Sequence, residues 1–482
     1  MKQLLIIIFI LIAGGAKGYT KDFDYSHITP HPRLLLKEGE ERNIHMVLQK
    51  NTVLQAFHKR ILDYCDETLK EPPVKRIKEG KRLLGVSRIV LKRVFYLSYA
   101  YRMTSEEKYL RRAEKEMLAA ASFTDWNPSH FLDVSEMSMG LAIGYDWLFN
   151  ELLPDSRKKI RQAIVEKAIE ASKTKHASFY KSRTNWNQVC NGGLVCSALA
   201  IYEDEPEKTK EIINKALQTV PLALECYAPD GGYPEGFGYW SYGTSYQVML
   251  NDALESSLGH DAGLSDYPGF LQSAQYIQYM TAPTGDCFNF SDASPKAYGN
   301  IMMFWFAHKT KNPSLLWLEK KYLNDANLEF GEYLEERFLP CLLIFASRID
   351  LDEVTSPKGN TWHSRGKNPV YIYRSGWNSK TDTYLGVKGG TASTSHAHMD
   401  AGSFIYEQAG VRWAMDLGMQ DYYSLESKGV DLWDTKQYSQ RWQVFRIGSS
   451  AHNTLTIDGK NHQVNGLSLI HISEPTRRVV IS

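Results

Sequence analysis

The chain has 482 residues, of which 43% are hydrophobic and 23% are charged. These ordinary globular values exclude a disordered or collagen-like chain, and at roughly 150 residues per domain the length corresponds to about three domains. The 56 basic and 55 acidic residues leave a net charge of +1, which excludes a global attraction to nucleic acid or to an anionic membrane. The six Cys have neither the density of a disulfide scaffold nor the spacing of a zinc knuckle.

The N-terminus has the pattern of a secretory signal peptide. Lys2 precedes an apolar run from Leu4 to Ala13, and small residues follow as far as Gly18. The run is too short for a transmembrane helix, and no Cys follows it that could carry a lipid anchor. We therefore expect residues 1–18 to be cleaved and the mature protein to be periplasmic or secreted, with no membrane attachment.

Apolar residues recur at three- and four-residue steps from about residue 34 to residue 347, which predicts helices. The predicted helices are Leu83–Met103, Tyr109–Phe123, Met137–Phe149, Ile160–Ser172, Gly193–Tyr202, Ile212–Cys226, Tyr246–Leu258, Phe270–Met280, Met302–Ala307 and Leu334–Ser347. Pro and Gly turns separate them, and no heptad seam is present. Residues 19–350 are therefore predicted to be stacked helical hairpins, either a solenoid or a closed α/α toroid.

After a polar stretch at Asp352–Asn368 the composition changes to short β-branched and aromatic runs, which predict an antiparallel β domain over residues 351–466. The expected strands are Val370–Arg374, Thr383–Val387, Ser403–Tyr406, Val411–Met415, Trp442–Ile447 and Asn453–Ile457, with a hairpin turn at Gln408-Ala409-Gly410. Six strands are few for a two-sheet sandwich. The fold class is therefore α+β, a domain of stacked helical hairpins followed by a β domain that we expect to be truncated.

The last residues, 467–482, do not continue this pattern. The run from Leu467 to Arg477 resembles a peptide translated from a sequencing adaptor. We expect the native sequence to stop near Gly466.

Two His and an Asp alternate in the segment from Ser395 to Asp400. In an extended segment His396, His398 and Asp400 point to one face, which favours a metal site or an acid/base site over a structural histidine. Zinc would require a third ligand from a neighbouring strand, for which Asp416 and His452 are candidates.

Two segments of the helical domain are unusually rich in amide or aromatic side chains. One is Asn185-Trp186-Asn187-Gln188, and the other is the aromatic and glycine-rich segment from Asp230 to Tyr242. They are explained either as a helix cap and a packed turn or as the polar and aromatic lining of a substrate cleft.

Five motifs, taken together and in this order, resemble the heparinase II/III-like polysaccharide lyases over residues 30–466. They are His31–Leu35, Asn185–Gln188 with Cys190–Gly193, Asp230–Tyr239, His396–Asp400 and Ala451–Leu455. The resemblance implies an α/α toroid followed by an antiparallel β-sandwich, with the active site between them. It also implies β-elimination on an acidic, uronate-containing polysaccharide or oligosaccharide of the glycosaminoglycan or alginate kind.

The chemistry of a lyase assigns roles to these residues. A lyase must neutralise the uronate carboxylate, remove the C5 proton and protonate the leaving oxygen. The resemblance implies Tyr239 as the acid, and as the base too when both groups lie on one side. It implies His396 as the base for the opposite epimer and Asn187 as the neutralising amide. This chain has Asn187-Gln188 where some relatives carry His, so we expect no His-based step from that loop.

The resemblance also implies a structural zinc held by His398, Asp416 and His452, and no organic cofactor. The expected substrate-binding residues are Asn185, Gln188, Tyr233, Trp240, Tyr242, Tyr438 and Arg446. A basic run from Lys75 to Arg93 is either a solvated helix face or a surface that attracts a polyanion.

Three alternatives come from other classes. A toroid glycoside hydrolase would use paired carboxylates from Asp230, Glu235 and Asp292. A glycan-binding protein would use the aromatic residues without catalysis. A zinc hydrolase is disfavoured because the sequence has no His-Glu-x-x-His motif.

Overall fold

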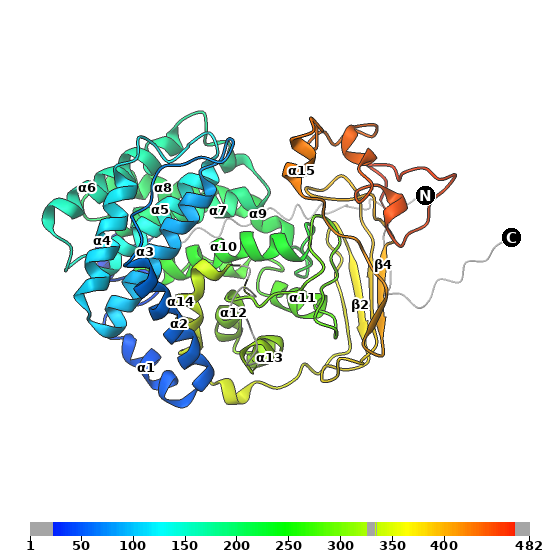
Figure 1. Cartoon of the computed structure of the whole chain (residues 1–482), viewed down its shortest axis with the longest axis horizontal. Helices are drawn as coiled ribbons and strands as arrows, with labels where there is room; N and C mark the ends of the chain where they lie inside the picture. Colours follow the sequence, from blue (N-terminus) through cyan, green and yellow to red (C-terminus); the bar gives the residue numbers. More distant parts are fainter. Residues whose placement is uncertain (1–22, 325–332, 334, 468–482) are drawn as a thin grey trace, which may run out of the picture.

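The computed structural model of the chain describes residues 23–324, 333 and 335–467 (Figure 1). The predicted signal peptide, residues 1–18, lies outside the described residues, as does the predicted tail 467–482 apart from Leu467. Among the described residues, none of the helices combines the length and the apolar character needed to cross a bilayer.

A helical domain comes first in the chain. Its α-helices are α1 (Glu41–Lys50), α2 (Thr52–Thr68), α3 (Leu84–Thr104), α4 (Glu107–Ala121), α5 (Phe131–Trp147), α6 (Pro154–Ile164), α7 (Asn185–Ala200), α8 (Pro206–Thr219), α9 (Pro221–Leu224), α10 (Phe237–Leu258), α11 (Ser273–Met280), α12 (Met302–Thr310), α13 (Trp317–Asn324) and α14 (Leu339–Ala346).

These helices close a ring. The helices α3, α5, α7 and α10 pack side by side in that order, α12 connects α10 to α14, and α14 returns to α2 and α3. A solenoid would leave its first and last helices apart, so the ring shows the toroid rather than the open alternative. In Figure 1 the shorter outer helices, among them α4, α6 and α8, lie around this ring. The predicted α/α toroid is confirmed.

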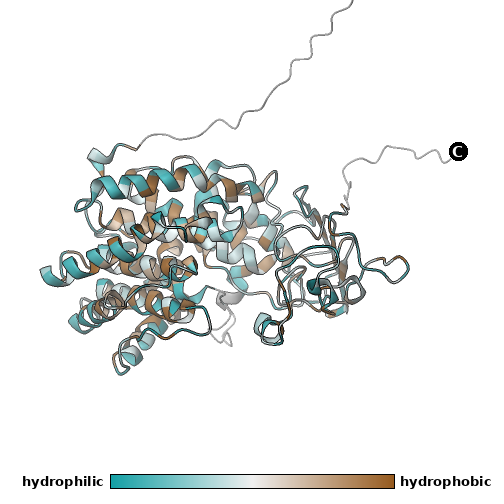
Figure 2. Ribbon diagram, turned by 90° about the horizontal axis from the view of Figure 1, so that it is seen from above, coloured by the Kyte–Doolittle hydropathy of each residue, from teal (hydrophilic) through white to brown (hydrophobic). Residues whose placement is uncertain are grey.

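The central helices are buried on every side. Every residue of α5 is buried, and nearly every residue of α7 is. Gly193 makes the close packing of α7 on α5 possible, because a Cβ at that position would lie 2.4 Å from the carbonyl oxygen of Ser135. Helices that are apolar on all sides belong in the interior. The outer helices show mixed polar and apolar residues instead (Figure 2).

A five-stranded antiparallel sheet follows, with the strands in sequence order: β1 (Thr361–His363), β2 (Val370–Arg374), β3 (Tyr384–Lys388), β4 (Phe404–Gln408) and β5 (Val411–Ala414). The predicted hairpin turn lies between β4 and β5, where Ala409 and Gly410 both have positive φ, 54° and 79°. Two positive φ values match the twist of a two-residue hairpin. A β-bulge at Tyr406/Glu407 bends this hairpin.

The two faces of the sheet have different surroundings. On the inner face Ile372, Tyr384 and Ile405 are fully buried in the same apolar core as the helices. On the outer face Phe404 is 40% exposed and Trp413 is 68% exposed. The described residues thus form one sheet of the predicted sandwich, and they place no second sheet over its outer face.

Two of the predicted strands are wrong. Trp442 lies in the 3-10 helix Gln440–Gln443, and residues 453–457 form no strand. Trp442 instead packs in a small apolar cluster with Met399 and Leu432. β-branched and aromatic residues favour a strand only where a neighbouring strand offers hydrogen bonds, and neither segment has such a neighbour among the described residues. The short strand β1 falls inside the polar stretch 352–368, which carried no strand prediction.

Candidate active site

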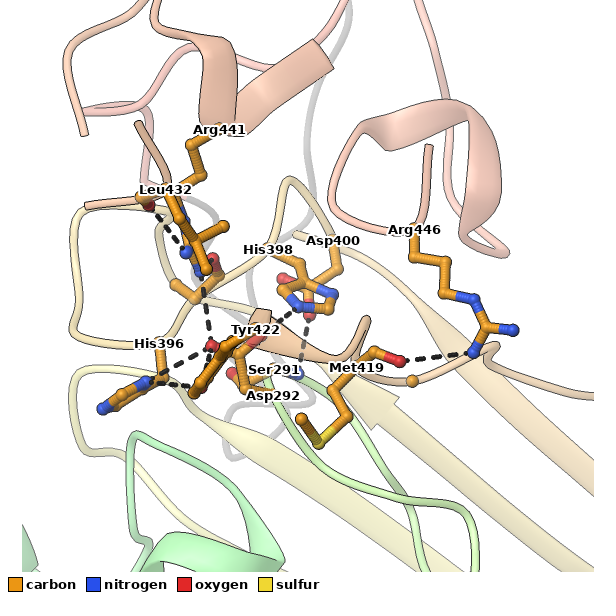
Figure 3. Close-up of polar contacts among 12 residues, drawn as sticks. Ser291, Asp292, His396, His398, Asp400, Met419, Tyr422, Leu432, Arg441 and Arg446 are labelled. Carbon is orange, nitrogen blue, oxygen red and sulfur yellow. Dashed lines mark hydrogen bonds and ion pairs between the residues drawn. The ribbon is translucent and has the colours of Figure 1, made fainter. Parts of the chain in front are cut away.

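Four residues that are far apart in the sequence meet where the helical domain joins the β domain. Tyr239 lies in the first turn of α10, and Asp292 lies in the loop between α11 and α12. His396 lies in the loop between β3 and β4, and Tyr422 begins the short helix α15 (Tyr422–Glu426). Figure 3 shows the side chains of His396, Tyr422 and Asp292 pointing toward one another.

Asp292 is the centre of this cluster. Its Oδ2 accepts hydrogen bonds from the Tyr422 hydroxyl at 2.8 Å and from His396 Nδ1 at 3.2 Å. Its Oδ1 lies 2.9 Å from His398 Nε2, and Arg441 places a guanidinium nitrogen 3.5 Å from Oδ2. The side chain of Asp292 is only 1% exposed. A carboxylate with this many donors is an anchor for its neighbours and has no free lone pair to attack a substrate.

The ionisation of Asp292 follows from these partners. Burial by itself would raise the pKa of this carboxyl, but the hydrogen bonds from His396 and His398 and the charge of Arg441 hold the pKa far below its usual range. Asp292 is therefore ionised at neutral pH.

His396 adopts an uncommon backbone conformation. Its φ is 58°, in the left-handed region, and the segment around it forms turns. The expectation of an extended segment that aligns His396, His398 and Asp400 is therefore wrong. The turn nevertheless brings both imidazoles to the same carboxylate, and left-handed non-glycine residues are concentrated at functional sites. Asp400 instead pairs with the buried Lys388 at 2.6 Å.

The hydrogen bonds of His396 define its tautomer. A carboxylate can only accept, so Nδ1 carries the proton that points to Asp292, and Nε2 of the neutral ring keeps its lone pair. The nearest acidic group to Nε2 is Glu235 Oε2 at 3.8 Å. The side chain of His396 is 14% exposed, so a small molecule or chain end can reach it.

Tyr239 lies flat against His396. The two ring centroids are 3.8 Å apart and the planes differ by 17°. The Tyr239 hydroxyl lies 2.8 Å from that of Tyr422. Tyr422 donates its own proton to Asp292, so it accepts the proton of Tyr239. Burial raises the pKa of Tyr239, and the negative charge of Asp292 adds to the increase, so the phenol is protonated at neutral pH.

Glu235 is a further acidic residue at the site. It comes immediately before the glycine at which α10 begins, and its side chain is 4% exposed. Burial, opposed by His396 and reinforced by Asp292, raises the pKa of Glu235 to about 7. Glu235 and Asp292 thus have opposite ionisation tendencies at neutral pH.

The amide segment at the start of α7 is buried. Asn187 donates hydrogen bonds to the carbonyl oxygens of Ser182 and Thr219, both at 2.9 Å, and its Oδ1 accepts one from Asn191. Its amide is fully occupied by the protein itself. Gln188 donates to the Tyr227 hydroxyl at 3.0 Å.

Asn185 differs from these two amides. Its Oδ1 is buried without a partner, and its side chain lies against Gly243 on α10, one turn from Tyr239. The described residues provide no hydrogen bond to this amide.

The aromatic residues expected to bind substrate separate into two groups. Tyr233 and Trp240 are 1% and 0% exposed and belong to the apolar core. Tyr242 is partly exposed, and its hydroxyl donates to the buried carboxylate of Glu136 at 3.1 Å.

The three residues expected to bind metal, His398, Asp416 and His452, lie close together. The rings of His398 and His452 have centroids 5.3 Å apart. His398 Nδ1 and His452 Nε2 are both buried without a partner, while the second nitrogen of each ring contacts a carboxylate, Asp292 or Asp416. The carboxylate at His452 is that of Asp416, whose Oδ2 lies 2.7 Å from His452 Nδ1. Within the described ranges no three His, Cys, Asp or Glu side chains converge on one point that could hold a metal.

The two remaining candidates lie away from the cluster. Tyr438 is 90% exposed and borders a separate 320 Å³ cavity with Trp442 and Lys460. Arg446 donates to the carbonyl oxygens of Leu417 and Met419 at 2.7 and 3.2 Å, and Figure 3 shows it directed away from His396.

The structure adds residues that sequence reasoning did not assign to a lyase site. Asp292 and Glu235 were considered only as glycosidase carboxylates, and Tyr422 and Arg441 were not considered. Asp292 stands in a loop without any pattern, and Tyr422 lies in a segment for which no element was predicted. Only the folded chain brings these residues to His396.

We compared the chain with known proteins. Residues 370–478 match the family model described as heparinase II/III-like, C-terminal. No curated protein matches the sequence.

Similar solved structures include a crystal structure of heparinase III (15% identity, TM-score 0.49, covering 82% of this chain and 57% of that chain). Another is a mutant of the heparan sulfate lyase HepC from Pedobacter heparinus (15% identity, TM-score 0.48, covering 82% and 56%). A third is the heparinase III BT4657 gene product (15% identity, TM-score 0.45, covering 84% and 62%). The chain thus spans less than two thirds of the length of each of these three structures. The family match covers residues 370–478, which is less than half of the chain.

Proposed function

We propose that this protein is a polysaccharide lyase that cleaves a uronate-containing acidic polysaccharide by β-elimination. The observation that carries the proposal is the stacked pair of Tyr239 and His396, in which the phenol ring lies against an imidazole whose Nδ1 contacts the carboxylate of Asp292. The family match supports it. Similar solved structures are those of a heparinase III and of a heparan sulfate lyase, and we take a glycosaminoglycan as the first substrate class to test.

In the proposed reaction His396 acts as the base. Its Nε2 takes the C5 proton of the uronate, and the electron pair of the C5–H bond forms the C4–C5 double bond while the C4–O bond breaks. Asp292 holds the other nitrogen at 3.2 Å, so the imidazolium that forms beside it is stabilised by a negative charge.

Tyr239 acts as the acid. It donates its proton to the leaving oxygen, and burial favours the protonated form that this role requires. The Tyr239 oxygen lies 2.8 Å from the Tyr422 hydroxyl, which can turn its proton from Asp292 to the tyrosinate that remains. The same raised pKa disfavours Tyr239 as a base, so we assign the base to His396 and the acid to Tyr239.

The uronate carboxylate must also be neutralised before its C5 proton becomes acidic. We assign this task to Asn185 in place of Asn187, because the Asn187 amide already donates to the carbonyl oxygens of Ser182 and Thr219, whereas no described residue accepts a hydrogen bond from the Asn185 amide nitrogen. Asn185 lies beside α10, one turn from Tyr239.

We propose a structural zinc bound to His398 and His452. The support is the pair of buried ring nitrogens without partners, each on an imidazole whose other nitrogen is oriented by a carboxylate, an arrangement that is common around zinc. Asp416 would orient His452, and the metal would fix the segment that carries His396. The reaction described above does not pass through the metal.

The N-terminal signal pattern supports a periplasmic or secreted location for the enzyme.

The carboxyl groups of Glu235 and Asp292 leave one alternative to be tested, a glycoside hydrolase. Glu235 and Asp292 have divided ionisation, as the acid and the nucleophile of a glycoside hydrolase do. The burial of Asp292 under four donors argues against a nucleophile.

The deciding experiment is incubation with uronate polysaccharides while ultraviolet absorbance is recorded, because only elimination creates a conjugated double bond. New reducing ends without absorbance would establish hydrolysis. Binding without either product would establish a glycan-binding protein.

A further inference from the structure

A buried ion cluster lies one helical turn from Tyr239 and is not used by the chemistry above. At its centre is Glu136 on α5, whose side chain is 0% exposed. Arg337 binds both carboxylate oxygens, at 2.7 and 2.8 Å, and Tyr242 donates to Oε1 at 3.1 Å. A buried carboxylate paired in this bidentate way is already neutralised.

A second arginine is attached to the same carboxylate. Arg88 on α3 donates from Nε to Glu136 Oε1 at 3.0 Å, and its guanidinium carbon lies 5.1 Å from the centre of the Tyr242 ring. The two Nη groups have no hydrogen-bond partner among the described residues. The Arg88 side chain is 41% exposed, whereas that of Arg337 is 8% exposed. The Nε edge of the Arg88 guanidinium is therefore fixed by Glu136, and its Nη edge is accessible to solvent.

The balance of charge leaves Arg88 available to an outside anion. Arg88 and Arg337 face two carboxylates, Glu136 and Glu335. Burial raises the pKa of Glu335, and protonation of Glu335 leaves the cluster with one positive charge in excess. Two unpaired N–H groups of a planar guanidinium match the geometry of a carboxylate or a sulfate.

The location connects Arg88 to the candidate active site. Tyr242 and Tyr239 are three residues apart on α10, so they lie on the same side of the helix, and both are partly exposed. Gly238 lies on the same helix beside Tyr239, and a Cβ at Gly238 would meet no atom within 4 Å. The surface next to the two tyrosines is therefore open.

We propose that Arg88, held by Glu136 and Tyr242, is a subsite for an oxyanion of the sugar chain next to the residue that is cleaved. This inference rests on the proposed function and deepens it. The oxyanion is the carboxylate of a uronate or the sulfate of a neighbouring sugar, and the same guanidinium fork recognises both.

The test measures kcat and KM of Arg88→Gln and Arg88→Lys on an unsulfated glucuronate–hexosamine polymer and on its sulfated counterpart. Arg88→Gln keeps a donor for Glu136 and loses the charge. We expect its KM to rise about 10- to 100-fold, the range for a lost charged hydrogen bond, with kcat changed less than about threefold. Arg88→Lys keeps the charge without the fork and should be intermediate. A carboxylate subsite raises KM on both polymers, and a sulfate subsite raises it on the sulfated polymer alone.

Arg111 on α4 is a matched control. Its side chain is 42% exposed and it is held by Glu107 and Glu114 at 3.1 and 3.0 Å, with no contact to α10. Arg111→Gln should leave KM unchanged. An equal rise in both variants would mean diffuse attraction and would overturn the subsite, as would an unchanged KM in Arg88→Gln.

Equilibrium binding of a uronate oligomer separates this inference from the proposed function. If the parent protein forms no unsaturated product, the lyase proposal fails, yet weaker binding by Arg88→Gln than by Arg111→Gln would still support the subsite. Equal binding by these two variants would overturn it. The melting temperature of each variant shows whether the buried cluster around Glu136 is still folded. If Arg88→Gln melts at a lower temperature than the parent, binding by Arg88→Lys is compared with that of the parent instead.

Discussion

The ring of Tyr239 stacks on the ring of His396 with 3.8 Å between the centroids. One residue comes from the first helical domain and the other from the β domain, 157 positions later in the chain. The contact therefore depends on how the two domains pack, and it places the two groups of the proposed elimination within reach of one sugar ring.

Removing the Tyr239 hydroxyl should abolish most of the activity. Tyr239→Phe keeps the ring that stacks on His396 and loses the proton that is donated to the leaving oxygen. We expect turnover to fall about a hundred- to ten-thousand-fold, as for other general acids. Formation of unsaturated product measures it. Tyr423→Phe, at the neighbouring tyrosine of α15 that is 78% exposed, should retain full activity. Near-normal elimination by Tyr239→Phe would remove this residue from the mechanism.

Changing Asp292 to Asn should reverse the tautomer of His396. The Asn amide can donate toward Nδ1, which then loses its proton, so that Nε2 carries it and cannot act as a base. Turnover should fall at least about a hundredfold. The control is Asp286→Asn on the same loop, where the side chain is 42% exposed. Activity in Asp292→Asn equal to that of the control would contradict the assigned orientation of His396.

Metal analysis tests the proposed zinc. The purified protein should contain about one equivalent, and His398→Ala should lose the metal and melt at a lower temperature, because metal binding is coupled to folding. His308→Ala changes an exposed imidazole that contacts only the Arg348 carbonyl oxygen and should retain the metal. An active enzyme without any metal would exclude the site.

Glu319 should make the folded state less stable as the pH rises. Burial raises the pKa of Glu319 from 4.5 to about 8. The unfolded chain releases this proton above about pH 4.5 and the folded chain keeps it until about pH 8, so stability is lost between these values. At one pKa unit per about 1.4 kcal/mol, the loss reaches at most about 5 kcal/mol.

The variant Glu319→Gln cannot ionise and should escape this loss. Its melting temperature relative to the parent should increase steadily from pH 5 to pH 8. Glu207→Gln, at a side chain that is 90% exposed, should follow the parent at every pH. A constant difference between Glu319→Gln and the parent across this range would show that Glu319 does not titrate in the folded protein.

The exposed apolar residues on the outer face of the sheet should make this protein self-associate. Phe404, Trp413 and Met415 are 40%, 68% and 56% exposed on neighbouring strands or just beyond, and contiguous apolar patches of this kind favour association. Trp413→Lys should reduce both dye binding and the mass measured by light scattering. Met46→Lys replaces an apolar residue of similar exposure, 53%, on the helix α1 and should change neither. No difference between the two variants would contradict the assigned role of this face.

Local sequence patterns determined the elements of this protein. The 3.6-residue period predicted the helices of the ring, because each helix buries apolar residues at that spacing. The composition of Val370–Arg374 and the turn at Ala409-Gly410 predicted the sheet. They failed at Trp442 and Ile457, which have the composition of strands, because the part of the chain that the structure describes places no strand beside them.

The motifs likewise identified Tyr239, His396 and His398 as chemically important, the histidines from their alternating spacing and Tyr239 from the family resemblance. Only the tertiary structure decided how they work together. Asp292 joins the two histidines, Tyr422 joins Asp292 to Tyr239, and Asn187 proved to be fully bonded within the helical domain while Asn185 remained free. A hydrogen bond between residues a hundred positions apart leaves no periodic trace in the sequence, since it depends on the packing of whole domains.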